Sequence, residues 1–154
     1  MAVTDTDLYR FLHKTDLPNR IALIVDDKPT PGLLYPQFES KIIQSGSRRQ
    51  ERAPDVDLGV DPKTGETVVK SGGGTSLWDK DGVLKGSWRT FKIPTGTVVP
   101  ESLKVKKGYY NRDKQATHYQ IEVMAGQIAI DGFKGALDNL ARNAVVRAIE
   151  LAKG

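Results

Sequence analysis

A glycine-rich run followed by two hydroxyls is the first stretch of this chain that could do chemistry. Residues 71–79 read SGGGTSLWD, so Thr75 and Ser76 come directly after three glycines and lead into an apolar strand. Because glycine lacks a side chain, such a turn lets a backbone approach a ligand closely. A phosphate-binding P-loop is excluded, since no Lys-Ser/Thr pair follows the glycines at the spacing that this loop requires.

A second such stretch is residues 117–123, in which polar and apolar side chains alternate. A period of two predicts a strand with one face in the core and the other face directed outward. The outward face then carries His118, Gln120 and Glu122, which are an imidazole, an amide and a carboxylate in a row. A histidine and a carboxylate could act together as general acid and base.

Composition excludes several kinds of site. The chain has no cysteine, which rules out disulfides, thiol nucleophiles and zinc held by thiolates, and it has only two histidines, so we expect no metal. The formal net charge is +4, and the basic residues form three loose clusters, at 48–52, 104–107 and 112–114, as is typical of a solvated surface. We expect no membrane segment, because the longest aliphatic run is far shorter than a bilayer span, and no secretory signal peptide is visible.

The elements that must position these residues are short strands and one helix. Apolar residues at three-and-four spacing predict a C-terminal amphipathic helix over 131–152, with Asp131 as its N-cap. A polar stretch predicts a mobile loop over 45–61. The chain is therefore predicted to be a single α+β domain over residues 1–154, with a compact mixed or antiparallel β core closed by the helix. The predicted strands lie at 8–12, 66–70, 76–79, 88–93, 103–106 and 117–123.

Seven short motifs occur in one order along the chain and together carry a resemblance that none of them carries alone. They are Arg52-Ala53-Pro54-Asp55, Gly73-Gly74-Thr75-Ser76 with Asp79, Ile93-Pro94-x-Gly96-Thr97, Pro100-x-x-Leu103-Lys104-Val105-Lys106, Tyr110-Asn111-Arg112, Gln115-Ala116-Thr117-His118-Tyr119 and Leu137-Asp138-Asn139-Leu140-x-Arg142-Asn143-Ala144. Over residues 52–154 this series resembles the Tse-two (Tse2) family of type VI secretion effector toxins, and Leu8-Tyr9-Arg10 is similar to that family's opening strand.

The resemblance implies the fold of ADP-ribosyltransferase toxins and a reaction that uses NAD as its substrate. It also implies action in the cytoplasm of a target cell, after delivery by a type VI secretion apparatus, which needs no signal peptide. A cognate immunity protein is expected to neutralise such a toxin, and this partner should be acidic because the chain carries a net charge of +4. The acceptor of the ADP-ribosyl group is left open.

The resemblance also implies roles for individual residues. On the first strand, Tyr9 and Arg10 are the candidates for contact with the dinucleotide, while Thr75 and Ser76 form a hydroxyl strand that shapes the pocket. Tyr110 is the candidate for stacking on nicotinamide. These roles suit the chemistry, because transfer of ADP-ribose passes through a cation-like sugar, and the site must hold nicotinamide flat and orient the ribose hydroxyls.

One position departs from the pattern of the wider fold. Most of these transferases use a glutamate on a late strand, where the family motif places His118 in this chain. Gln120 and Glu122 on the same strand face resemble the Gln-x-Glu motif of arginine-modifying relatives. We therefore rank His118 first and Glu122 second for the late-strand role, with Ser76 as a further catalytic candidate. We expect Arg10, Ser76 and His118 to converge on one ligand.

Two other interpretations stay open. In the first, the chain is a small basic ribonuclease-type or nucleic-acid-binding toxin, which uses His118 and Glu122 as its acid–base pair. In the second, it is a non-enzymatic toxin whose helix 131–152 occupies a groove of a partner. Binding of NAD separates both from the transferase.

Overall fold

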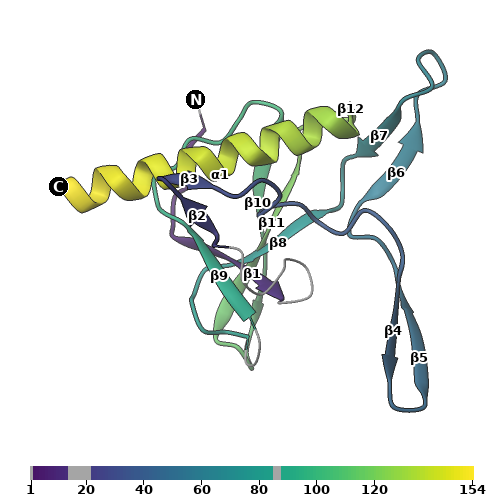
Figure 1. The fold of residues 1–154 in the computed structure, drawn as a ribbon, viewed down its shortest axis with the longest axis horizontal. Coiled ribbons are helices and arrows are strands. Elements are labelled where there is room, and N and C mark those ends of the chain that lie inside the picture. Colours follow the sequence, from purple (N-terminus) through teal and green to yellow (C-terminus); the bar gives the residue numbers. More distant parts are fainter. Residues whose placement is uncertain (1, 14–21, 85–87) are drawn as a thin grey trace.

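A five-stranded antiparallel sheet lies at the centre of the molecule, and one long helix runs across it (Figure 1). The computed structural model describes residues 2–13, 22–84 and 88–154. Neighbouring strands follow the order β10-β11-β8-β1-β9, so segments far apart in the sequence lie side by side. Their bounds are Leu103–Asn111 for β10, Ala116–Val123 for β11, Gly74–Trp78 for β8, Leu8–His13 for β1 and Trp88–Ile93 for β9.

Three smaller antiparallel sheets accompany the central one. The first has three strands in the order β12-β7-β6, and the other two are the pairs β2–β3 and β4–β5. The described part of the chain is therefore an α+β fold of antiparallel sheets with a C-terminal helix, which confirms the predicted fold class. The bounds are Gln127–Ala129 for β12, Thr67–Lys70 for β7, Asp57–Val60 for β6, Ile24–Val25 for β2, Lys28–Pro29 for β3, Lys41–Ser45 for β4 and Arg48–Arg52 for β5.

The helix α1 (Ile130–Lys153) buries one stripe of its surface against the sheet, as its apolar spacing predicts. Its predicted N-cap is wrong. Ala129 holds that position and Asp131 lies in the first turn, because β12 runs directly into the helix and sets its start. The fully buried stripe includes Phe133, Leu137, Leu140 and Ala144.

None of the helices found in residues 2–13, 22–84 and 88–154 is both long enough and apolar enough to cross a membrane.

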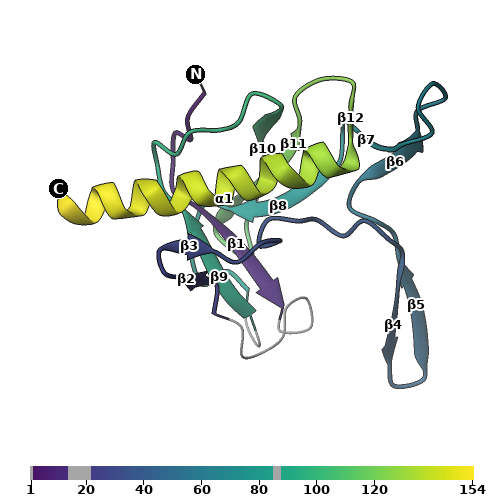
Figure 2. The ribbon, with the colours of Figure 1, turned by 45° about the horizontal axis from the view of Figure 1, so that its top comes forward.

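The two faces of the central sheet have different surroundings. The face under α1, called here the helix face, belongs to the main core, with Leu8, Leu77 and Ile121 among its buried residues. The opposite face, called here the outer face, carries a smaller cluster that includes Phe11 and Trp78. Figure 2 shows α1 along one side of the sheet. Because side chains alternate along a strand, the register assigns each site residue to one of these faces.

Strands replace the loop that we expected over residues 45–61. Between β4 and β5 the chain turns through Gly46 at a φ of 61°, and β6 pairs with β7 in the three-stranded sheet. The β4–β5 hairpin projects away from the rest of the molecule (Figure 1). A ribbon that stands in solvent needs no alternation of apolar and polar residues, so its composition looks like that of a loop.

Some of the motif residues tie distant segments together. The Asp138 carboxylate of α1 accepts hydrogen bonds from the Gly32 amide at 3.0 Å and the Tyr35 hydroxyl at 2.7 Å. Burial, together with this carboxylate, raises the pKa of Tyr35 to about 12. The Thr97 hydroxyl donates to the Pro94 carbonyl at 2.7 Å and closes a buried turn. These residues stabilise the fold.

Candidate functional site

Ser76, His118 and Gln120 share the outer face of the sheet. The strands β8 and β11 are neighbours, and their register places Ser76 opposite Gln120 and Trp78 opposite His118. Ser76 and His118 are therefore diagonal neighbours, with Cα atoms about 7–8 Å apart. Ser76 is exposed and the other two are half-buried, so all three are open to a ligand on this face.

Aromatic rings surround the imidazole of His118. The Tyr109 ring stacks on it with centroids 5.3 Å apart and an interplanar angle of 20°, and the Trp78 ring meets it edge-on at 5.1 Å. Burial lowers the pKa of His118, because a low-dielectric environment penalises the charged imidazolium. The neutral imidazole therefore prevails at pH 7, and one of its ring nitrogens can accept a proton or a hydrogen bond.

A β-bulge in β10 brings the stacking tyrosine to this position. The register shifts between Lys107 and Tyr110, so Gly108 and Tyr109 together lie opposite His118. A Cβ atom on Gly108 would lie 2.8 Å from the carbonyl oxygen of His118, which explains why a glycine occupies this position. The close approach of the two backbones carries Tyr109 onto the imidazole.

Tyr110, which we expected to stack on nicotinamide, points to the other side of the sheet. It pairs with Thr117, which precedes His118 and therefore lies on the opposite strand face. Its side chain is 60% exposed. The structure places Tyr109, and not Tyr110, beside His118. Sequence reasoning missed Tyr109 because the extra residue of the bulge reverses the alternation along β10.

Arg10 lies on the helix face, since it alternates in β1 with the core residues Leu8 and Leu12. Its guanidinium donates hydrogen bonds to the carbonyl oxygens of Tyr35 at 3.0 Å and Ser76 at 3.4 Å. The Arg10 side chain therefore contacts the main chain of β8, not its hydroxyls. The same side chain connects the segment before β4 to the sheet.

The pairing of β1 with β8 beside this arginine is short. Tyr9 of β1 pairs with Trp78 of β8, and the two strands diverge beyond this position (Figure 2). Tyr9 lies on the outer face, on the same side as Trp78 and His118. Of the three side chains that we expected to converge on one ligand, Ser76 and His118 share the outer face. The expectation is wrong for Arg10, because alternation directs its side chain to the helix face.

Thr75 and Ser76 face opposite sides of β8, although we expected both to shape the pocket. Thr75 is fully buried, and its hydroxyl donates to the Leu34 carbonyl at 2.6 Å. This hydrogen bond holds the segment that covers the helix face. Ser76 alone presents a hydroxyl of β8 to the outer face.

Glu122 lies on the outer face but is only 3% exposed, at the position opposite Gly74. It is four residues from His118 along β11, which separates their Cα atoms by about 13 Å. The two side chains stand on the same face without meeting. This spacing does not provide an acid–base pair that acts on the same atoms of one phosphodiester.

Two of the three glycines in the run at 71–79, Gly73 and Gly74, pack against the protein's own backbone. A Cβ atom on Gly73 would collide with the Asp55 carbonyl, and one on Gly74 would collide with the Ile121 carbonyl. The Gly74 amide also donates to the Asp55 carbonyl at 2.9 Å. The close approach that these glycines allow is therefore that of neighbouring chain segments, which sets the start of β8 against β11.

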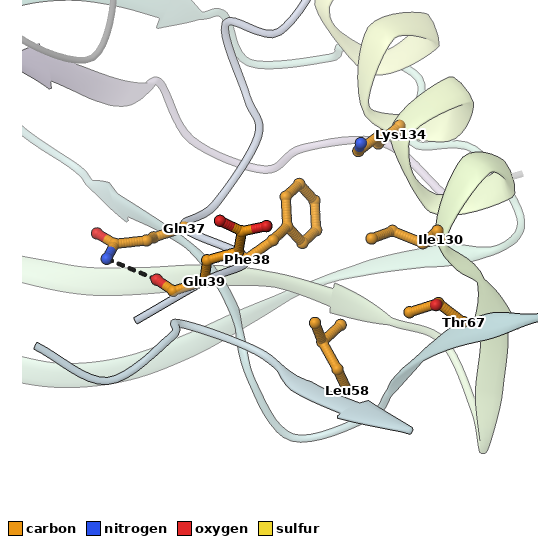
Figure 3. A pocket seen from close by; sticks show the side chains of 7 residues that line it. All are labelled: Gln37, Phe38, Glu39, Leu58, Thr67, Ile130 and Lys134. Atoms are coloured by element: carbon orange, nitrogen blue, oxygen red, sulfur yellow. Dashed lines mark hydrogen bonds between the residues drawn. The ribbon is translucent and has the colours of Figure 1, made fainter. Parts of the chain in front are cut away.

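A cavity of about 600 Å³ lies apart from these residues, beside the start of α1 (Figure 3). Side chains of α1, β6, β7 and the segment before β4 line it, and the Gln37 side chain donates to the Glu39 carbonyl at 2.8 Å across its rim. The cavity is lined by Gln37, Phe38, Glu39, Leu58, Thr67, Ile130 and Lys134.

In residues 2–13, 22–84 and 88–154 there is no group of three or more His, Asp or Glu side chains that could hold a metal ion.

Comparison with known proteins agrees with the short motifs. A family model described as "Tse2 ADP-ribosyltransferase toxin" matches residues 4–149. The chain is also 37% identical over 150 residues to a protein named Toxin Tse2 from Pseudomonas aeruginosa strain PAO1. That alignment covers 97% of this chain and 86% of the relative. Both matches extend over the central sheet and nearly all of α1.

Proposed function

The chain belongs to the Tse2 ADP-ribosyltransferase toxin family, and on this premise we propose that it transfers ADP-ribose at the outer-face site formed by Ser76, Tyr109, His118 and Gln120. The family makes the chain a toxin and an ADP-ribosyltransferase, for which NAD is the substrate. One observation carries the location of the site. Ser76 and His118, which the family motifs single out, come from adjacent strands and open onto the same face.

The reaction breaks the bond between C1′ of a ribose and N1 of nicotinamide. Nicotinamide leaves with the bonding electron pair, and the ribose carries a positive charge that its ring oxygen shares. The acceptor then bonds to C1′ and gives up a proton. Because the transition state is cation-like, groups that orient the ribose and place electron density beside it lower the barrier.

The residues of the outer-face site suit these tasks. The neutral imidazole of His118 accepts a hydrogen bond from a ribose hydroxyl, which brings a lone pair close to the developing charge. The exposed hydroxyl of Ser76 holds the carboxamide or the ribose from the neighbouring strand. The Tyr109 ring keeps the imidazole in one orientation and offers a flat surface at the rim.

The geometry favours the transferase over a ribonuclease. General acid–base cleavage of RNA needs two groups within hydrogen-bonding reach of the same reacting atoms. His118 and Glu122 are separated by about 13 Å along one strand, and Glu122 is buried. His118 therefore takes the late-strand role in this proposal, and Glu122 supports the strand beside it.

The proposal extends to the setting in which the toxin acts. We propose that the chain is delivered by a type VI secretion apparatus, acts in the cytoplasm of the target cell and is neutralised by a cognate immunity protein. We expect that protein to be acidic, since a net charge of +4 speeds its association with a partner of opposite sign. An association rate that does not fall with added salt would contradict this.

Release of nicotinamide from NAD by the purified chain tests the site directly. Ser76→Ala and His118→Ala should each lower kcat/KM by about 10²–10³, the usual effect of losing a group that stabilises the transition state. Ser71→Ala, an exposed serine in the same glycine-rich run, is the matched control and should stay within about twofold of the parent. Growth inhibition on expression in a bacterial host should follow the same order.

Glu122→Gln separates the two late-strand candidates. We expect nicotinamide release and toxicity to survive in this variant, provided that circular dichroism shows it folded. If folded Glu122→Gln lost nicotinamide release completely while His118→Ala stayed active, the catalytic role would belong to the Gln-x-Glu motif. If Ser76→Ala and His118→Ala both remain fully toxic at matched expression, the outer-face site is refuted.

A further inference from the structure

The positive charge of the chain is concentrated in one short segment. Residues 104–114 contain five basic residues and one acidic residue, which gives +4, the same as the net charge of the whole chain. The whole chain has 23 basic and 19 acidic residues, so 18 of each remain outside this segment, and the rest of the chain has no net charge. We call residues 104–114 the basic strip, and its cations are Lys104, Lys106, Lys107, Arg112 and Lys114.

Two exposed tyrosines interrupt these cations. Tyr109 and Tyr110 are 59% and 60% exposed, and Lys106 and Lys107 just before them are exposed as well. The strip forms β10 and the turn after it, and β10 is an edge strand with β11 as its neighbour in the sheet. The Lys114 ammonium lies 5.4 Å from the centroid of the Trp78 ring. Two exposed tyrosines thus lie between two groups of cations along a solvent-facing edge.

This strip borders the outer-face site. Lys106 lies opposite Gln120 in the register of β10 and β11, and Lys104 lies opposite Glu122. The Tyr109 ring stacks on His118. A polyanion bound along the strip would therefore pass beside the imidazole.

We propose that the acceptor of the ADP-ribosyl group is a single-stranded nucleic acid that binds along the basic strip. This inference rests on the proposed function and names its acceptor. A nucleophilic atom of the nucleic acid bonds to C1′ as the bond to nicotinamide breaks, and its proton passes to solvent. The phosphates and unstacked bases of a single strand match a segment that carries both cations and exposed tyrosine rings, because bases stack on aromatic side chains while the cations follow the backbone. An acidic protein surface would use the cations but leave the tyrosine faces without a role.

Fluorescence anisotropy with labelled 20-nucleotide single-stranded RNA and DNA of mixed sequence tests binding. The strip variant Lys106→Gln/Lys107→Gln/Arg112→Gln should bind at least tenfold more weakly than the parent. Its binding should also depend less on salt: the slope of log K against log salt should be shallower by about 2, because each of the three lost phosphate contacts accounts for about 0.7. The control Lys63→Gln/Lys80→Gln/Lys153→Gln removes three exposed charges elsewhere and should stay within about threefold. Tyr110 lies off the outer face, so its replacement does not alter the proposed site. Tyr110→Ala should weaken binding about tenfold through lost stacking.

Mass spectrometry of the oligonucleotides after incubation with NAD tests the transfer. An ADP-ribosylated oligonucleotide from the parent, and none from a strip variant that still releases nicotinamide, would support the inference. Nicotinamide release by a parent that neither binds nor modifies RNA or DNA would overturn the inference and leave the proposed function standing. Equal losses in the strip and control variants, or equally tight binding of polyglutamate, would also overturn it. Absence of nicotinamide release would refute the proposed function and the transfer together.

Discussion

Thr75 is expected to hold the fold and not the ligand, although it precedes Ser76 in the same motif. Its hydroxyl is fully buried on the helix face and donates to the Leu34 carbonyl at 2.6 Å. Thr75→Val keeps the shape of the side chain and its preference for a strand, and removes only the donor. The substitution therefore isolates this one hydrogen bond.

The magnitude follows from the burial of the acceptor. Leu34 is 0% exposed, so its carbonyl cannot turn to water when the hydroxyl is lost. An unsatisfied buried acceptor costs about 1–3 kcal/mol of the free energy of unfolding. For a chain of this size 1 kcal/mol shifts Tm by about 2–4 °C, so Thr75→Val should lower Tm by about 2–12 °C. Ser76→Ala, at an exposed position, should change the stability by no more than about 0.5 kcal/mol.

Two measurements on the same variants decide the roles of these neighbours. Thermal unfolding followed by circular dichroism gives Tm, and nicotinamide release at 20 °C gives kcat/KM. We expect Thr75→Val to lose stability but to keep kcat/KM within about threefold, because its hydroxyl points away from the outer face. Ser76→Ala should show the converse, with an unchanged Tm and an activity lower by about 10²–10³.

An unchanged Tm in Thr75→Val, together with a tenfold or larger rise in KM for NAD, would refute this reasoning. That result would mean that the threonine hydroxyl contacts the dinucleotide, as the family motif alone suggests. A parallel loss of stability and activity at 20 °C, with a folded circular dichroism spectrum, would show that the tie to Leu34 also positions the site.

The stability of the protein should depend on pH through His118. Burial lowers its folded-state pKa below the ordinary 6.5, so the unfolded chain takes up the proton first, and the free energy of unfolding should fall as the pH drops below about 6.5. The fall should level off below the folded-state pKa and be weaker in His118→Gln, as urea melts at several pH values would reveal. Tyr35→Phe removes the donor to Asp138 and should cost about 1.5–3 kcal/mol. Burial raises the pKa of both Tyr35 and Tyr119, so in an alkaline absorbance titration the step near pH 12 that belongs to Tyr35 should vanish in the variant. Gly108→Ala should displace the bulge and lower nicotinamide release at least tenfold, since its Cβ atom would press on the His118 carbonyl. Gly135→Ala, in open space on the helix, should instead raise stability by about 0.5–1 kcal/mol and leave activity unchanged.

The elements themselves could be predicted because their signals are local. Apolar residues at three-and-four spacing place the C-terminal helix within one residue of α1, and alternation places a strand at 117–123 that matches β11 within one residue. The order of the motifs identifies the family, which the match over residues 4–149 confirms. The same motifs point to Ser76 and His118, and the sheet places them on one face.

The tertiary structure alone decided which residues join them. Alternation tells which side chains of one strand share a face, but the pairing of strands distant in sequence decides which face meets the helix. This is why Arg10 lies on the helix face, and why Thr75 and Ser76 lie on opposite faces of the sheet although they are neighbours in the sequence. A single extra residue in β10 reverses the alternation there, so Tyr109 replaces Tyr110 beside His118. Two of the three loose clusters of charge are neighbours in the sequence already, and the tertiary structure adds that their segment forms an exposed edge of the central sheet, beside His118.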